Sequence, residues 1–158
     1  MRLMPTYTDP NVSVYDGPDR ILQVPFAAGT IFARRGGKAV DLHHRFQSAT
    51  ANSSFLAGFA EVDVVGLADG HPESVADGDE LPVNFAKEKS CVFPTSGGVL
   101  ADDTHIGKEF DVYVDAAGLQ YVNLNGHTHD VLRVSRLVTA DGLHVSCVIP
   151  DDRRFGSI

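Results

Sequence analysis

The chain has 158 residues, of which 43% are hydrophobic and 22% charged. These values exclude wholesale disorder and fit one domain with a buried core. Thirteen Lys and Arg against 21 Asp and Glu give a net charge of −8, which argues against a nucleic-acid-binding protein. No run approaches the roughly 20 apolar residues that span a bilayer, and residues 1–5 lack the apolar run of a signal peptide. We therefore expect a protein made in a cytoplasm, with neither nucleic acid nor membrane as partner.

The charge is unevenly spread along the chain. Residues 1–45 carry six Lys or Arg against four acids, whereas residues 46–158 carry seven against 17. Residues 61–80 contain seven acids and no Lys or Arg. Such asymmetry could steer docking to a partner of opposite sign, or it could simply keep an acidic loop solvated.

Residues 1–20 are predicted to form an irregular arm. Pro5, Pro10 and the segment Asp16-Gly17-Pro18-Asp19 interrupt regular structure there, and Tyr7 and Tyr15 are among its few apolar anchors. An arm of this kind either lies across its own domain or grips a neighbouring molecule. The rest of the chain, residues 21–158, is predicted to be a single β domain.

Short apolar runs separated by turn residues follow the arm, and they predict strands rather than helices. In the first part of the chain the strand candidates are residues 21–24, 30–33, 38–42, 55–65, 81–85 and 90–93. Gly36-Gly37 suits a tight hairpin turn between the second and third of these, with Arg34 and Arg35 at its tip. Residues 45–53 form the one weak helical candidate.

The last third of the chain gives the clearest strand pattern. Residues 110–114 and 119–122 flank a turn at Asp115-Ala116-Ala117-Gly118, and residues 130–138 meet residues 144–149 across Asp141-Gly142. An Asp-Gly pair between apolar runs is a strong hairpin signal. About ten strand candidates at this spacing predict an all-β fold, either a compact β-barrel or a β-sandwich.

The sharpest candidate for chemistry is the segment that contains His127, His129 and Asp130. Two histidines at positions i and i+2 of an extended segment point to the same side, and Asp130 could add an oxygen ligand. A metal-dependent hydrolase built on these three residues is one hypothesis. The alternative is a polar loop with incidental histidines, because no second cluster of ligands stands at a motif-like distance.

Other catalytic signatures are missing from the sequence. It contains no G-x-S-x-G, P-loop or G-x-G-x-x-G pattern. Cys91 and Cys147 lie in apolar runs, which indicates two buried thiols rather than a nucleophile. We therefore predict a protein that is not an enzyme, with no catalytic residues and no cofactor.

Residues 106–154 resemble the C-terminal segments of head decoration (cement) proteins of tailed bacteriophages. The resemblance rests on Gly107-Lys108-Glu109-Phe110-Asp111-Val112, Gln120-Tyr121-Val122, Asp130-Val131-Leu132-Arg133-Val134 and Val145-Ser146-Cys147-Val148-Ile149, and it covers about a third of the chain. It implies a structural virion protein that binds the outer capsid surface and stabilises the head. It further implies the major capsid protein as partner, a homotrimer, and assembly in the cytoplasm of a bacterial host.

A second interpretation is a β-rich receptor- or carbohydrate-binding module of a phage tail or fibre. For an assembly interface, the first candidates are Tyr7 and Tyr15, because aromatic anchors carry much of the energy of protein contacts. Arg34 and Arg35 are the next candidates, although surface solubility would also explain them.

Overall fold

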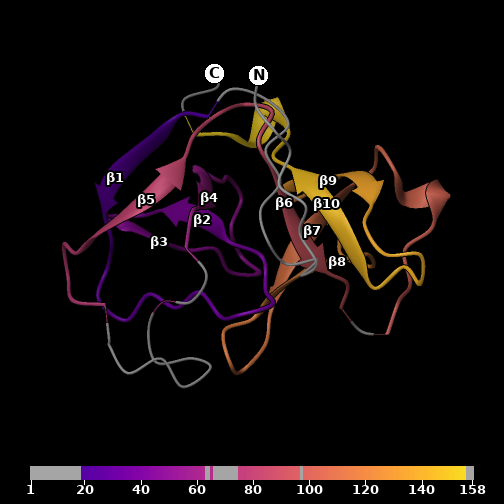
Figure 1. Cartoon of the computed structure of the whole chain (residues 1–158), viewed down its shortest axis with the longest axis horizontal. Coiled ribbons are helices and arrows are strands. Elements are labelled where there is room, and N and C mark those ends of the chain that lie inside the picture. Colours follow the sequence, from indigo (N-terminus) through magenta and orange to yellow (C-terminus); the bar gives the residue numbers. More distant parts are fainter. Residues whose placement is uncertain (1–18, 63–64, 66–74, 97, 156–158) are drawn as a thin grey trace.

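The computed structural model describes residues 19–62, 65, 75–96 and 98–155, and these residues form mainly antiparallel strands. Figure 1 shows two five-stranded sheets side by side, the first from residues 21–84 and the second from residues 90–148. The predicted all-β class is therefore confirmed. Residues 1–18 of the predicted arm, which include Tyr7 and Tyr15, lie outside the described residues.

The first sheet has the order β1-β5-β4-β2-β3, and every neighbouring pair is antiparallel. Its strands are β1 (Ile21–Pro25), β2 (Ala39–Leu42), β3 (Phe46–Ser48), β4 (Gly58–Ala60) and β5 (Glu80–Asn84). β1 is an outer strand of this sheet, with Ile21 and Leu22 exposed.

The second sheet has the order β6-β10-β9-β7-β8. Its strands are β6 (Ser90–Pro94), β7 (Glu109–Val114), β8 (Gln120–Asn123), β9 (Leu132–Leu137) and β10 (His144–Val148). A bridge between Thr95 and Val122 joins the end of β6 to β8, so this sheet curls towards a closed barrel.

The described part of the chain also holds two short 3₁₀ helices, η2 (Asp103–His105) and η3 (Asp151–Arg153). No helix among the described residues is long and apolar enough to cross a membrane.

The strand predictions succeed best where sequence alternation and turn residues agree. β7 and β8 form the predicted hairpin, in which Gly118 takes a φ of 84°. β9 and β10 form the other, with Gly142 at a φ of 76°. The helical candidate at 45–53 is wrong, because β3 occupies residues 46–48 and a turn follows it. The long strand predicted at 55–65 is wrong in extent, since β4 covers only residues 58–60 of it.

Gly36 and Gly37 serve a purpose other than the predicted hairpin. That hairpin is wrong, because Phe32 forms its bridge with Val65 and β2 pairs with β3 and β4. A Cβ added at Gly37 would lie 1.9 Å from the ring atom Cε2 of Phe93, a residue of β6 in the second sheet. The glycines therefore allow the chain to pass closely against that sheet.

Gln120 of β8 joins the two sheets by hydrogen bonds. Its side chain is buried, its Oε1 accepts from the N–H of Ala39 (2.8 Å), and its Nε2 donates to the carbonyl of Ala39 (2.9 Å). Its backbone carbonyl also accepts from the N–H of Gly37 (3.0 Å). The side-chain amide thus makes with Ala39 the pair of hydrogen bonds that a neighbouring strand would make with the start of β2.

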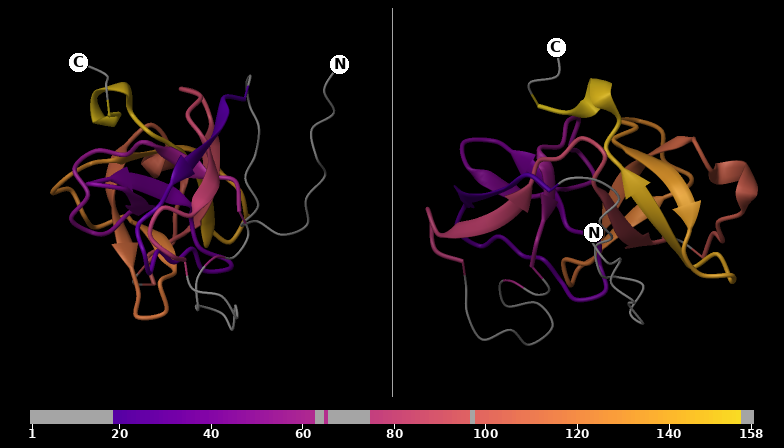
Figure 2. Two further views of the ribbon diagram at one scale, coloured as in Figure 1. Left: turned by 90° about the vertical axis from the view of Figure 1, so that its left-hand side faces the viewer. Right: turned by 45° about the horizontal axis from the view of Figure 1, so that its top comes forward.

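The larger apolar core is shared between the two sheets. Phe59 of β4 and Phe93 of β6 are fully buried in it, with ring centroids 6.0 Å apart in an edge-to-face arrangement. The right-hand view of Figure 2 also shows the two sheets side by side, as this shared core requires. A smaller core, which includes Phe26, Phe32 and Val83, lies within residues 24–85, the part of the chain that forms the first sheet.

The two cysteines face each other in the second sheet. Cys91 of β6 and Cys147 of β10 are register partners, and both side chains are fully buried. Burial raises the pKa of the Cys147 thiol well above its ordinary value, and Cys91 adds to that effect. The prediction of two buried thiols is confirmed.

After β10 the chain returns to the first sheet. The N–H of Leu56 donates to the carbonyl of Arg153 (2.8 Å), and Leu56 forms a bridge with Arg154. Figure 1 shows this yellow segment running along the top of the molecule towards β1. The return places Arg154 and Phe155 beside the start of β1.

Candidate functional site

The segment that contains the two histidines is organised around a buried carboxylate. Asp111 of β7 is 7% exposed, and its two oxygens accept from the backbone N–H groups of Thr128 (2.9 Å), His129 (2.6 Å) and Asp130 (2.8 Å). Asp130 has a φ of 51°, which wraps the loop around this carboxylate. Burial by itself would raise the pKa of Asp111, but the three N–H donors outweigh it and hold that pKa below its ordinary value.

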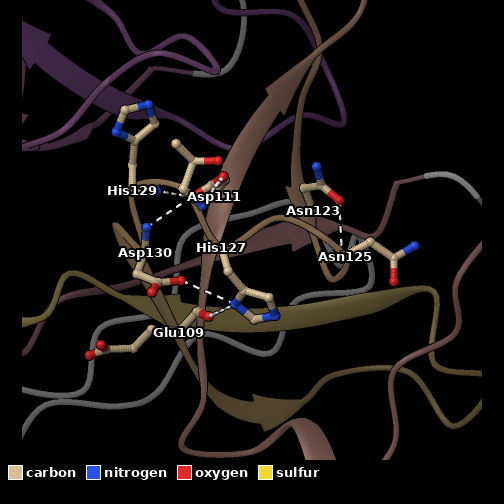
Figure 3. A network of polar contacts seen from close by, with 8 residues as sticks. Glu109, Asp111, Asn123, Asn125, His127, His129 and Asp130 are labelled. Atoms are coloured by element: carbon tan, nitrogen blue, oxygen red, sulfur yellow. Dashed lines mark hydrogen bonds and ion pairs between the residues drawn. The ribbon is translucent and has the colours of Figure 1, made fainter.

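The histidine side chains of this loop have separate partners. Nδ1 of His127 lies 3.1 Å from the carbonyl of Glu109 and 3.2 Å from Oδ1 of Asp130. Nδ1 of His129 lies 3.2 Å from Oγ of Ser54, and Figure 3 shows its ring pointing away from His127. The structure thus brings His127 and Asp130 together but leaves His129 apart.

The described residues include no group of three or more His, Cys, Asp or Glu that could hold a metal ion. The fold explains the loop without one, because the Asp111 carboxylate satisfies three successive backbone donors. The same-side geometry expected of positions i and i+2 does not arise, since the segment from 127 to 130 is turned rather than extended.

The predicted interface arginines lie in an exposed turn. Arg34 and Arg35 are both exposed, and Arg35 has a φ of 68°. Neither residue lines the pocket described next. Their assignment to an interface stays a prediction.

A pocket of about 380 Å³ lies where the end of the chain meets the first sheet. Its walls combine cationic and apolar side chains, and no acidic residue lines it among those described. The lining residues are Arg20, Leu22, Ala57, Phe85, Lys87, Arg154 and Phe155.

Arg154 is the unusual member of this pocket, because it is a charged side chain in a buried position. The residue is 6% exposed, and its Nη2 donates to the carbonyls of Ala86 (3.1 Å) and Lys87 (2.7 Å). Its buried Nε has no hydrogen-bond partner among the residues that the structure describes. Burial lowers the pKa of Arg154 and nearby Asp151 partly opposes this shift, but a guanidinium remains protonated at neutral pH.

The ion pairs formed among the described residues do not include Arg154. A buried charge is costly unless an opposite charge or a full set of hydrogen bonds accompanies it. The described part of the chain therefore gives this guanidinium two backbone acceptors but no carboxylate in direct contact.

Exposed apolar side chains border the pocket. Leu22 of β1 is 53% exposed and Phe155 is 40% exposed. Phe55 is 42% exposed and packs against Phe155 in a tilted arrangement, with ring centroids 5.9 Å apart. We call Leu22, Phe55, Phe155 and the pocket beside them the Arg154 surface.

Sequence reasoning missed this surface. Leu22 falls within a predicted strand, and Arg154 stands at the end of the last one, with nothing local to indicate burial. The burial of Arg154 depends on its bridge to Leu56, which is almost a hundred positions away in the chain. The available signal was weak: an arginine beside Phe155, close after an apolar strand.

Comparison with known proteins gives no relative, since no protein-family model, curated protein or solved structure matches this chain.

Proposed function

We propose that the chain is a structural virion protein, which binds the outer surface of a tailed-phage capsid and stabilises the head. The observation that carries the proposal is the Arg154 surface, where Leu22, Phe55 and Phe155 expose apolar area around a cationic pocket. Contiguous exposed apolar area commonly marks a protein interaction site. The partner in this proposal is the major capsid protein.

The fold supports a structural role in a further way. Gln120 and Gly37 fasten the two sheets to each other, and the second sheet curls so that β6 and β8 meet. A stiff unit loses little conformational freedom when it docks, so more of its contact energy remains as affinity. The resemblance to decoration proteins falls on this second sheet and the chain end that follows it.

Oligomerisation belongs to the same proposal. A homotrimer would present three copies of the Arg154 surface to the capsid, and linked contacts of modest strength give tight binding overall. Light scattering from the purified chain across a concentration series should give a mass three times the 17.0 kDa of the chain.

The direct test is cosedimentation of the purified chain with heads of the phage that encodes it. We expect saturable binding, and we expect Leu22→Asp to weaken it at least tenfold. Leu100→Asp is the matched control, because Leu100 is 54% exposed against 53% for Leu22 but does not line the pocket. Absence of head binding by the unchanged chain would contradict the proposal, and so would equal losses in the two variants.

A further inference from the structure

We propose that the Arg154 pocket binds a carboxylate from an extended segment of a partner protein, with apolar residues beside that carboxylate. The proposal rests on the assembly function above and adds to it the chemistry that the partner must present. It concerns an acidic side chain of the partner rather than a free ion.

The charge of the pocket selects an anion. Arg154 is buried, and its Nη2 is the nitrogen that has acceptors within the described part of the chain. The exposed cations Arg20 and Lys87 line the same pocket. A carboxylate placed there would compensate the buried guanidinium by a charge-assisted hydrogen bond, which is about twice as strong as a neutral one. No acid among the described residues lines the pocket, and we assign the anion to a partner protein.

The apolar side chains that line the pocket favour an anion with apolar groups beside it. Leu22, Phe85 and Phe155 line the pocket, and Phe55 continues the apolar surface beyond Phe155. An inorganic anion would leave these side chains in water. A carboxylate flanked by aliphatic or aromatic groups would cover them, which favours burial by about 25 cal/mol per Å² of apolar area.

The position of β1 beside the pocket favours a peptide segment as the carrier of the carboxylate. Arg20 and Leu22 belong to the start of β1 and its lead-in, and β1 is the outer strand of its sheet, paired with β5. An extended segment can add to such an edge through its backbone while alternate side chains enter adjacent pockets. The pocket volume of about 380 Å³ also accommodates a side chain rather than a large cofactor.

The experiment uses a pool of capped pentapeptides with a central glutamate between two residues drawn from valine, leucine and phenylalanine. A second pool replaces the glutamate by glutamine, and decanoate serves as a small carboxylate with an apolar chain. Binding to the full chain is measured by calorimetry and by competition. We expect the glutamate pool to bind at least tenfold more tightly than the glutamine pool.

Two arginine variants form a matched pair. Arg20→Gln removes an exposed arginine that lines the pocket, and Arg136→Gln removes an exposed arginine of β9 far from it in the fold. We expect Arg20→Gln to weaken binding of the glutamate pool three- to tenfold and Arg136→Gln to leave it unchanged. Arg154→Lys, checked for an unaltered circular dichroism spectrum, should weaken it at least tenfold.

Several results would overturn the inference. Equal affinity for the two pools would show that the pocket does not recognise the carboxylate. Absence of binding by the glutamate pool would show that the pocket does not bind such peptides. Decanoate that binds more tightly than the glutamate pool and displaces it would assign the pocket to a small molecule.

The head-binding assay separates this inference from the proposed function. If Arg154→Lys binds heads as well as the unchanged chain does, the pocket proposal fails and the assembly function stands. If the glutamate pool binds while the unchanged chain ignores heads, the pocket stands and the assembly function fails.

Discussion

Asp111 and Arg154 are both charged side chains buried in the described structure, yet their surroundings differ. Asp111 accepts three backbone N–H groups from one loop, so the chain itself supplies what this carboxylate needs. Arg154 has two carbonyl acceptors, an Nε without a partner and no ion pair among the described residues. The comparison separates a charge whose partners the fold supplies from one that our proposal pairs with an anion of another molecule, and it directs functional tests to the second.

The largest effect should come from Asp111. In Asp111→Asn an NH₂ group replaces one carboxylate oxygen, so at least one of the three backbone donors loses its acceptor. We expect a loss of about 2 kcal/mol in the free energy of unfolding, since a hydrogen bond to a charged group contributes about 1.5–3 kcal/mol. Denaturant unfolding measures this loss. Asp152→Asn, at an exposed position in η3, should stay within about 0.5 kcal/mol, and an equally small change for Asp111→Asn would refute the structural role.

Gln120 is a third buried polar side chain, neutral in this case, and backbone groups of the same chain form hydrogen bonds with its amide. Gln120→Met keeps the length of the side chain but removes the acceptor for the N–H of Ala39. The carbonyl of Ala39 retains the N–H of Ala49 as a donor, whereas the carbonyl of Ala49 loses the longer hydrogen bond from Nε2 of Gln120 (3.5 Å). We expect a loss of about 1–2 kcal/mol in the free energy of unfolding. An unchanged denaturant midpoint would show that Gln120 does not fasten the two sheets.

Acid pH should act through Asp111 in a defined direction. Its folded-state pKa is lowered from the ordinary value of 3.8, so its contribution is fully present above that value and is lost as the pH falls through the folded-state pKa. Unfolding curves between about pH 6 and pH 2 should therefore show a steeper loss of stability for the unchanged chain than for Asp111→Asn. Parallel losses would contradict the pKa assignment.

The smallest effect on folding should come from Arg154. Arg154→Met removes a buried charge and keeps an apolar stem, and replacement of poorly compensated buried charges is often neutral or stabilising. The carbonyls of Ala86 and Lys87 lie in a turn at the surface, where water can replace the guanidinium. We expect a change within about 1 kcal/mol in the free energy of unfolding, and a loss as large as that of Asp111→Asn would mean that Arg154 serves the fold.

The sequence predicted the strands of the last third well, because alternation in residues 110–114 and the Asp141-Gly142 turn are local signals. It misjudged Gly36 and Gly37, since the reason for these glycines is Phe93, which lies more than fifty positions further along the chain. It gave Gln120 no role, because the partner of that side chain is Ala39, 81 positions earlier. Arg154 was missed for the same reason, as its burial follows from contact with Leu56.

The histidine hypothesis shows a different limit of sequence reasoning. His127, His129 and Asp130 have the right residue types and spacing for a metal site on an extended segment. The buried carboxylate of Asp111, sixteen or more positions earlier, turns that segment and separates the two rings. Residue type could be read from the sequence, whereas the conformation of the loop depended on a long-range contact.

The most direct test of the contrast between the two charges is the nitrogen–proton spectrum of the arginine Nε groups during titration with the glutamate peptides. The signal that disappears in Arg154→Met identifies Arg154. We predict that this signal shifts progressively as the glutamate peptides bind, while the Arg136 signal and the backbone signals of residues 128–130 stay in place. Peptide binding that leaves the Arg154 signal unmoved would contradict the account.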